Sequence, residues 1–180
     1  MITRRQAREW ALQLLVQFDL NPPASLDRGI EEFWEMQAQL EVESLAEGPH
    51  DAQAVFTATE PALQASLVEM RAFTEDRVRG VWAERSVLDE KIGGFLRNWS
   101  MYRLGSVERN ALRIGAWELL HCPEIPAPIL VNEAIDLAKF FSETKSGKFV
   151  NGVLDNFAKK IRAPKAETFT PGESGSPVGD

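Results

Sequence analysis

The chain has few of the residues that build disulfide frameworks or metal centres. Cys122 is its single cysteine, and His50 and His121 are its only histidines. One thiol excludes an intramolecular disulfide, and the set is too small for a zinc site of thiolates and imidazoles. We therefore expect Cys122 to be a buried or half-buried structural residue, and we expect neither a metal nor a cofactor.

Long apolar runs are also missing. No stretch approaches the roughly 20 residues that a helix needs to cross a bilayer. The N-terminus is arginine-rich and then amphipathic, unlike the continuous apolar segment of a secretory signal. We expect a cytoplasmic protein without a membrane partner. Its 180 residues, 44% of them hydrophobic, are enough for one compact domain or for two small helical halves that share a core.

The motifs of common catalytic sites are absent as well. The sequence has no glycine-rich cofactor loop after a predicted strand, and no Ser, His and Asp or Cys and His set that suggests a nucleophile. We therefore expect a protein that is not an enzyme.

Apolar residues recur near the 3.6-residue helical period along most of the chain, and no segment requires a strand. Thr3 and Gln6 have the spacing of a capping box, which predicts a first helix from about Arg4. Its predicted buried face is Trp10, Ala11, Leu14, Leu15 and Phe18. The pattern predicts an all-α bundle of about seven helices in two packed subdomains. Further helices are expected over about 26–46, 61–83, 86–99, 106–121, 131–141 and 148–161.

The helix over 106–121 is apolar on several sides, so we expect it to lie at the centre of the bundle. Gly115 and Ala116 would let a neighbouring helix approach closely. Beyond residue 162 the sequence loses periodicity and is rich in Pro, Gly and Ser, which predicts a disordered tail over 163–180. The predicted domain is therefore 1–162.

Charge is segregated along the chain, although the net charge is -7. Residues 20–102 contain 15 acidic and 7 basic residues, whereas residues 103–162 contain 7 acidic and 9 basic residues. If the first helix packs beside the last two, the basic ends of the chain form one patch on an acidic body. Such a surface favours a selective anion site over general binding to polyanions.

Basic residues lie where the helix dipole disfavours them. Arg4, Arg5 and Arg8 fall in the first two turns of the first helix, where cations oppose the positive end of the macrodipole. The predicted loop 142–147 carries Lys145, and Lys148 opens the next predicted helix. An external anion would explain both clusters. The alternative is a solvated helix start in which Arg5 pairs with Glu9 at i,i+4.

Three segments closely resemble the NusB family of bacterial transcription antitermination factors: RRQAREWALQLLVQFDL, NWSMYRLGSVERNALRIGAWELL and IPAPILVNEAIDLAKFFSETKSGKFVNGVLD. The resemblance covers residues 4 to about 161, with a longer, acidic middle over about 21–85. It implies an all-helical, non-catalytic protein that binds boxA RNA as a heterodimer with NusE, a small-subunit ribosomal protein. The implied setting is transcription of ribosomal RNA operons, with other Nus factors in the elongation complex.

The resemblance also implies roles for individual residues. The predicted RNA-binding residues are Arg4, Arg5, Arg8, Lys145, Lys148, Phe149 and Asn151. Arginine grips phosphates or stacks on bases, and aromatic and amide side chains bind splayed bases of single-stranded RNA. The predicted partner-binding residues are Glu108 and Val16, the latter standing where many relatives have Tyr. Alternatives remain open: Phe149 could join the core, Asn151 could bond the local backbone, and Glu108 could simply favour the helix dipole.

Two rival functions remain. The chain could be a dimeric helical scaffold that binds only proteins, its arginines paired with glutamates of a second copy. It could instead be the RNA-binding half of an enzyme, since a similar fold precedes ribosomal RNA cytosine methyltransferases. The chain has no room for a methyltransferase domain, so the second hypothesis is the weaker one.

Overall fold

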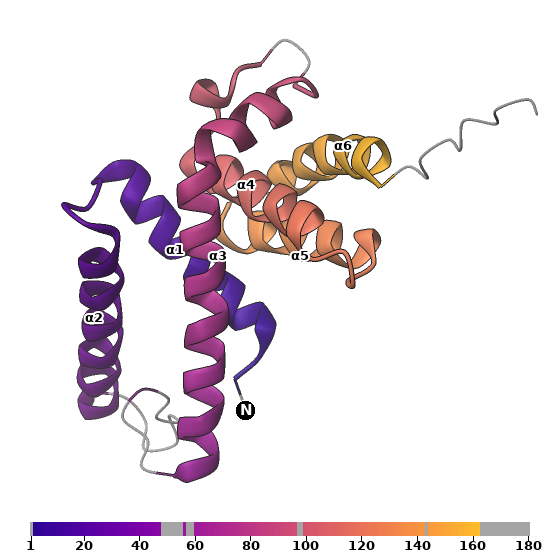
Figure 1. Cartoon of the computed structure of the whole chain (residues 1–180). Coiled ribbons are helices and arrows are strands. Elements are labelled where there is room, and N and C mark those ends of the chain that lie inside the picture. Colours follow the sequence, from indigo (N-terminus) through magenta and orange to yellow (C-terminus); the bar gives the residue numbers. More distant parts are fainter. Residues whose placement is uncertain (1, 48–55, 57–59, 97–98, 143, 163–180) are drawn as a thin grey trace, which may run out of the picture.

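The computed structural model describes residues 2–47, 56, 60–96, 99–142 and 144–162, and every regular element in these ranges is helical (Figure 1). The all-α prediction is confirmed, with six α-helices and one short 3-10 helix in place of about seven helices. The elements are α1 (Arg4–Leu20), α2 (Leu26–Glu47), α3 (Pro61–Gly93), η1 (Met101–Arg103), α4 (Ser106–His121), α5 (Ala127–Phe141) and α6 (Thr144–Ile161). The predicted tail 163–180 lies outside the described residues. No described helix is both long and apolar enough to span a bilayer.

α1 begins where its capping signal predicts. The Thr3 hydroxyl oxygen accepts a hydrogen bond from the Gln6 amide at 3.2 Å, which satisfies one of the free amides of the first turn. The predicted face from Trp10 to Phe18 is buried, so the helix is held in place by its apolar stripe.

α3 is one helix of 33 residues, and the predicted break near Ser86 is wrong. Neither glycine nor proline interrupts the helix there, and Ser86 is exposed in its interior. Asp89 does not help to start a new helix. Instead it accepts hydrogen bonds from Arg113 of α4 at 2.7 and 2.8 Å, a tertiary contact that local spacing does not reveal.

α6 begins at Thr144, so the predicted loop over 142–147 is wrong for 144–147; Ser142 is not helical, and residue 143 lies outside the described residues. Lys145 lies in the first turn of α6 and Lys148 in the second. The loop prediction rested on the polar, glycine-containing run around Gly147. That glycine is helical and buried, and a Cβ there would lie 2.7 Å from the Lys139 side chain of α5. Because glycine has no side chain, the aliphatic part of Lys139 can lie against α6 at this point.

α4 is the central helix, as the sequence predicts. It packs against α1, α3, α5 and α6, and residues 110–119 are all buried. Figure 1 shows α3 running the length of the molecule, with α2 along one side and α4, α5 and α6 on the other. Packing of α1 and α3 against α4 joins the N-terminal helices to the α4–α6 group.

The predicted close approach at Gly115 is confirmed. A Cβ there would lie 2.6 Å from Leu154 of α6 and 3.0 Å from Ala134 of α5. Because real Cβ contacts are longer, α5 and α6 approach α4 at a spacing that only glycine allows at this position. These three helices carry most of the predicted functional residues.

Candidate nucleic-acid interface

Arg5 connects the start of α1 to α5. Its guanidinium lies 3.4 Å from Glu9 in the same helix and 3.3 Å from Asp136 of α5, and half of the side chain is exposed. The Arg5–Glu9 pair of the alternative interpretation, a solvated helix start, is therefore present, and Arg5 also contacts Asp136, 131 residues away in the sequence.

Asp136 also lines a shallow hollow of about 410 Å³ between α5 and α6. The hollow contains Lys148 and Asn151, two of the predicted RNA-binding residues, together with Lys139. Asp136 thus places Arg5 beside this hollow, and the predicted convergence of the two ends of the chain is present here. Sequence reasoning missed Lys139. Two features of the sequence could have indicated it: Lys139 follows Asp136 by three residues, and it lies near the end of α5, shortly before the basic segment with Lys145 and Lys148.

The cations of this surface outnumber the acid at its centre. Arg5, Lys139 and Lys148 surround Asp136, and all three cationic side chains are exposed. Exposed ion pairs contribute about 0–1 kcal/mol, so a phosphate can replace Asp136 as the partner of Arg5 at little cost. We name this surface, formed by Arg5, Lys139, Lys148 and Asn151, the basic face; Arg4 precedes Arg5 on α1 and is also exposed.

Arg8 does not belong to the basic face, although the sequence grouped it with Arg4 and Arg5. It is buried, and its Nε lies 3.0 Å from the carboxylate of Glu118 in α4. A second contact of 3.3 Å reaches Glu133 of α5. The helical period does not explain the difference, because Arg4 and Arg8 are one turn apart and share a face of α1. Arg8 is buried because α4 and α5 cover the helix at that point. Arg8 therefore orients α1 from inside the bundle.

Arg4 lies at the exposed edge of this arrangement. Its guanidinium carbon is 5.7 Å from the centre of the Phe73 ring of α3, and Arg8 lies 5.2 Å from the same ring. The contact with Phe73 is at a distance at which a cation–π attraction operates. It leaves the Arg4 side chain exposed for an anion.

Lys145 and Phe149 occupy a separate groove, so the predicted RNA-binding residues of α6 divide between two hollows. The groove has a volume of about 540 Å³ and is lined by Trp99, Arg103, Leu104, Gly105, Glu108, Lys145, Ser146 and Phe149. We name it the η1–α6 groove. Phe149 is half-buried, and it both packs against the core and lines this groove.

Trp99 in this groove corrects a further expectation. The apolar pattern placed it on the buried stripe of a helix over 86–99, but α3 ends at Gly93 and 56% of Trp99 is exposed. The Gly93 and Gly94 pair was the signal that the helix stops early. Arg103, in the η1 turn, was not singled out from the sequence at all.

Glu108 is held by hydroxyl groups of the α5–α6 junction. Ser142 and Ser146 donate to the same carboxylate oxygen at 2.7 and 2.5 Å. Burial alone would raise the pKa of the Glu108 carboxyl, but these bonds and one from its own backbone amide outweigh it and lower the pKa below its ordinary value. Glu108 is therefore an ionised group that ties the start of α4 to α6.

Val16 lines a third, apolar hollow of about 380 Å³ between α1, α4 and α5. Leu12, Leu20, Val107 and Phe141 line it as well, and Leu20 is strongly exposed. Val107 directly precedes Glu108, so the two predicted partner-binding residues flank the same end of α4. Within the described ranges, no three or more His, Cys, Asp or Glu side chains are grouped to hold a metal ion. Cys122 is buried, as expected for a structural thiol.

Comparison with known proteins identifies the family. A sequence model of the NusB family matches residues 5–159. The chain belongs to the NusB family. It is 37% identical over 160 residues to the transcription antitermination protein NusB of Bacillus velezensis, an alignment that covers 89% of this chain and 98% of that protein. The resemblance seen in the three sequence segments is confirmed.

Solved NusB structures share the fold. The chain superposes on T. maritima NusB with a TM-score of 0.67 and 29% identity, covering 91% of this chain and 95% of that one. It also resembles a chain of a crystal structure of the antitermination factors NusB and NusE in complex with double-stranded RNA. The TM-score is 0.64 and the identity 25%, over 87% of this chain and 96% of that chain.

Proposed function

We propose that this chain is a non-catalytic transcription antitermination factor that binds boxA-type RNA together with NusE, in the transcription of ribosomal RNA operons. Its membership of the NusB family and its similarity to a NusB chain from a complex with NusE and RNA support this role. Other Nus factors of the elongation complex would be further partners. Action on nascent RNA would place the protein in the bacterial cytoplasm.

The observation that carries the RNA-binding proposal is the contact between Arg5 and Asp136. It brings Arg5 of α1 beside the hollow that Lys148 and Asn151 of α6 line, although these segments lie at opposite ends of the sequence. Arginine and lysine would bind phosphates, and the Asn151 amide would bind a base edge. Arg8 supports this surface as a positioning residue, because its ion pair with Glu118 fixes the first turns of α1.

NusE is proposed to dock over the end of α4 that Val16 and Glu108 flank. The hollow beside Val16 is almost entirely apolar, as expected for the centre of a protein interface. Glu108 lies in the first turn of α4, next to Val107 of this hollow, and its carboxylate is held by two serine hydroxyls. RNA and NusE would therefore bind adjoining surfaces, and Glu108, which also lines the η1–α6 groove, would lie where they meet.

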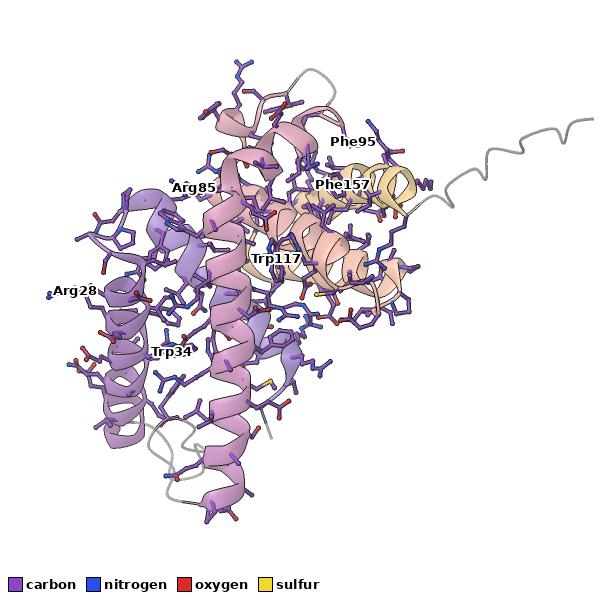
Figure 2. The ribbon with its side chains drawn as sticks, in the orientation of Figure 1. Arg28, Trp34, Arg85, Phe95, Trp117 and Phe157 are labelled. Atoms are coloured by element: carbon purple, nitrogen blue, oxygen red, sulfur yellow. The ribbon has the colours of Figure 1, made fainter. Side chains whose placement is uncertain are left out.

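Fluorescence anisotropy with labelled boxA RNA and a scrambled RNA, each with and without NusE, tests the proposal. The double variant Arg4→Ala and Arg5→Ala is expected to weaken boxA binding at least about ten-fold and to lower the salt slope by about 0.7 for each phosphate that is no longer bound. The control is Arg28→Ala with Arg85→Ala, two exposed arginines on α2 and α3 (Figure 2). Arg28 pairs with Glu32 at i,i+4, much as Arg5 pairs with Glu9.

Equal affinities of the two double variants would refute the basic face as the RNA site. Light scattering with and without RNA addresses the rival scaffold function. A stable homodimer that does not bind boxA RNA, with or without NusE, would favour the scaffold and contradict an antitermination role.

A further inference from the structure

The η1–α6 groove brings together aromatic and cationic side chains that lie far apart in the sequence. Trp99 and Arg103 come from the segment around η1, whereas Lys145 and Phe149 come from the first two turns of α6. Large aromatic side chains are usually buried, but more than half of Trp99 is exposed at the groove. The groove therefore presents an aromatic surface that no other part of the described chain covers.

The lining suits a flat, anionic ligand, since its two cations outnumber its one carboxylate, that of Glu108, which accepts hydrogen bonds from Ser142 and Ser146. An apolar ligand would use Trp99 and Phe149 but would leave the charges of Arg103 and Lys145 without a role. A nucleotide uses both kinds of side chain, because its base stacks on aromatic rings and its phosphates attract cations. The volume of about 540 Å³ leaves room for one base and its flanking backbone.

The α4–α6 wall of the groove is held in place before any ligand binds. Glu108 accepts hydrogen bonds from Ser142 and Ser146, which hold the first turn of α6 against the start of α4. Gly105 lies against this carboxylate, since a Cβ at that position would make the Glu108 side chain shift. A site held in advance loses less conformational freedom when its ligand binds.

The position of the groove favours RNA over a protein side chain. Ser146 and Phe149 line the groove, whereas Gly147, Lys148 and Asn151 line the hollow of the basic face. The same two turns of α6 therefore form one wall of each site. A strand bound at Lys148 can reach the groove by crossing α6.

We propose that the η1–α6 groove holds one unpaired base of the bound RNA, stacked against Trp99 and Phe149, with neighbouring phosphates at Arg103 and Lys145. This proposal rests on the proposed RNA-binding function and extends the RNA site to a turn between α3 and α4. The base in the groove is single-stranded, because stacking on a side chain requires it to leave its helix. A side chain of a protein partner is the competing occupant.

The test compares Trp99→Ala with Tyr102→Ala. Tyr102 belongs to the same turn and is 91% exposed, but it is not part of the groove lining. Trp99→Ala is expected to weaken boxA binding about ten-fold with an unchanged salt slope, the loss typical of one stacked base. Tyr102→Ala should bind like the original chain, and Trp99→Phe should recover most of the loss. Lys145→Ala should lower the salt slope by about 0.7.

A series of boxA RNAs with single abasic sites then locates the base. At the position that fills the groove, removal of the base should weaken binding to the original chain but not to Trp99→Ala, because the two changes delete one contact. Circular dichroism and thermal melting of each variant confirm that the fold is retained.

The outcomes separate this proposal from the proposed function. If the original chain binds boxA and Arg4→Ala with Arg5→Ala weakens it, but Trp99→Ala matches Tyr102→Ala, the groove proposal is overturned and the basic face stands. If Trp99→Ala lowers the affinity for NusE in the absence of RNA and leaves RNA binding intact, the groove belongs to the protein partner. If the original chain does not bind boxA with or without NusE, the proposed function itself fails.

Discussion

Arg8 Nε lies 3.0 Å from both carboxylate oxygens of Glu118, so the first helix is joined to the central helix by an ion pair inside the protein. Arg77 of α3 donates to the same carboxylate at 2.8 Å. One acidic side chain of α4 therefore pairs with two arginines, and it connects α1, which carries Arg5 of the basic face, to α3 and α4.

Glu118→Ala should lower the free energy of unfolding by about 3–5 kcal/mol, because it leaves two buried guanidinium groups without their shared partner. Because Arg8 keeps its contact with Glu133 and Arg77 keeps its contact with Asp76, the loss is expected near the lower end of this range. Urea unfolding at neutral pH measures it. Glu32→Ala is the control, since it removes an exposed pair and should cost less than about 1 kcal/mol. Similar losses for the two variants would contradict the importance assigned to burial.

Gly115→Ala and Gly152→Ala compare the same substitution at a closely packed and at an open position of a helix. At Gly115 a Cβ would meet Leu154 at 2.6 Å, so overpacking should cost about 1–3 kcal/mol. At Gly152 nothing lies within 4 Å, so alanine should stabilise α6 by up to about 1 kcal/mol. The two variants should shift the midpoints of thermal and urea unfolding in opposite directions, Gly115→Ala downward and Gly152→Ala upward. A stable Gly115→Ala would mean that the Leu154 side chain, or the helices α5 and α6, can move to make room for the methyl group.

Acid should weaken the junction around Asp19, which accepts hydrogen bonds from Arg109, Asn110 and Arg113. Burial acts to raise the pKa of Asp19, but these partners outweigh it and lower the pKa below 3.8. Since the folded chain binds the proton less tightly than the unfolded chain, the carboxylate stabilises the fold above the ordinary pKa. This stabilisation is lost as the pH falls through the lowered value.

Urea unfolding of Asp19→Asn and the original chain at pH 7 and pH 3 measures this effect. The variant should be less stable at pH 7, and the difference should shrink at pH 3, which lies below the ordinary pKa, so that the unfolded original chain takes up the proton. A difference that does not change with pH would show that Asp19 contributes through shape rather than charge.

Lys148→Ala should lower the slope of log affinity against log salt by about 0.7, the value for one phosphate contact with a single strand. Lys148 lines the hollow of the basic face. Lys159→Ala removes an equally exposed lysine from the other end of α6, and it should leave the slope unchanged. Titration of boxA RNA at several salt concentrations checks both variants. If the salt slopes of Lys148→Ala and Lys159→Ala were equal, a phosphate contact at Lys148 would be excluded.

Local signals in the sequence predicted much of the fold correctly. Thr3 caps α1 because a hydroxyl three residues before Gln6 can bond its amide, an interaction that depends on adjacent residues alone. The several apolar sides of α4 likewise predicted its central position, since such a helix must be covered by neighbours. The errors at Ser86 and at 144–147 arose where polar residues suggested a break, but Asp89 and Gly147 are helical and contact Arg113 and Lys139 of neighbouring helices.

The sequence by itself determined the helical class, the approximate elements, the segregated charge and the residue types able to bind RNA, because each depends on composition or on spacing along one helix. The tertiary structure alone decided which of those residues share a surface. Arg4, Arg5 and Arg8 look equivalent within α1, yet α4 and α5 cover Arg8 and leave the other two exposed. Lys145 and Lys148 are three residues apart, yet they line different hollows. Exposure and grouping depend on the helices that pack around a residue, and those helices come from distant parts of the chain.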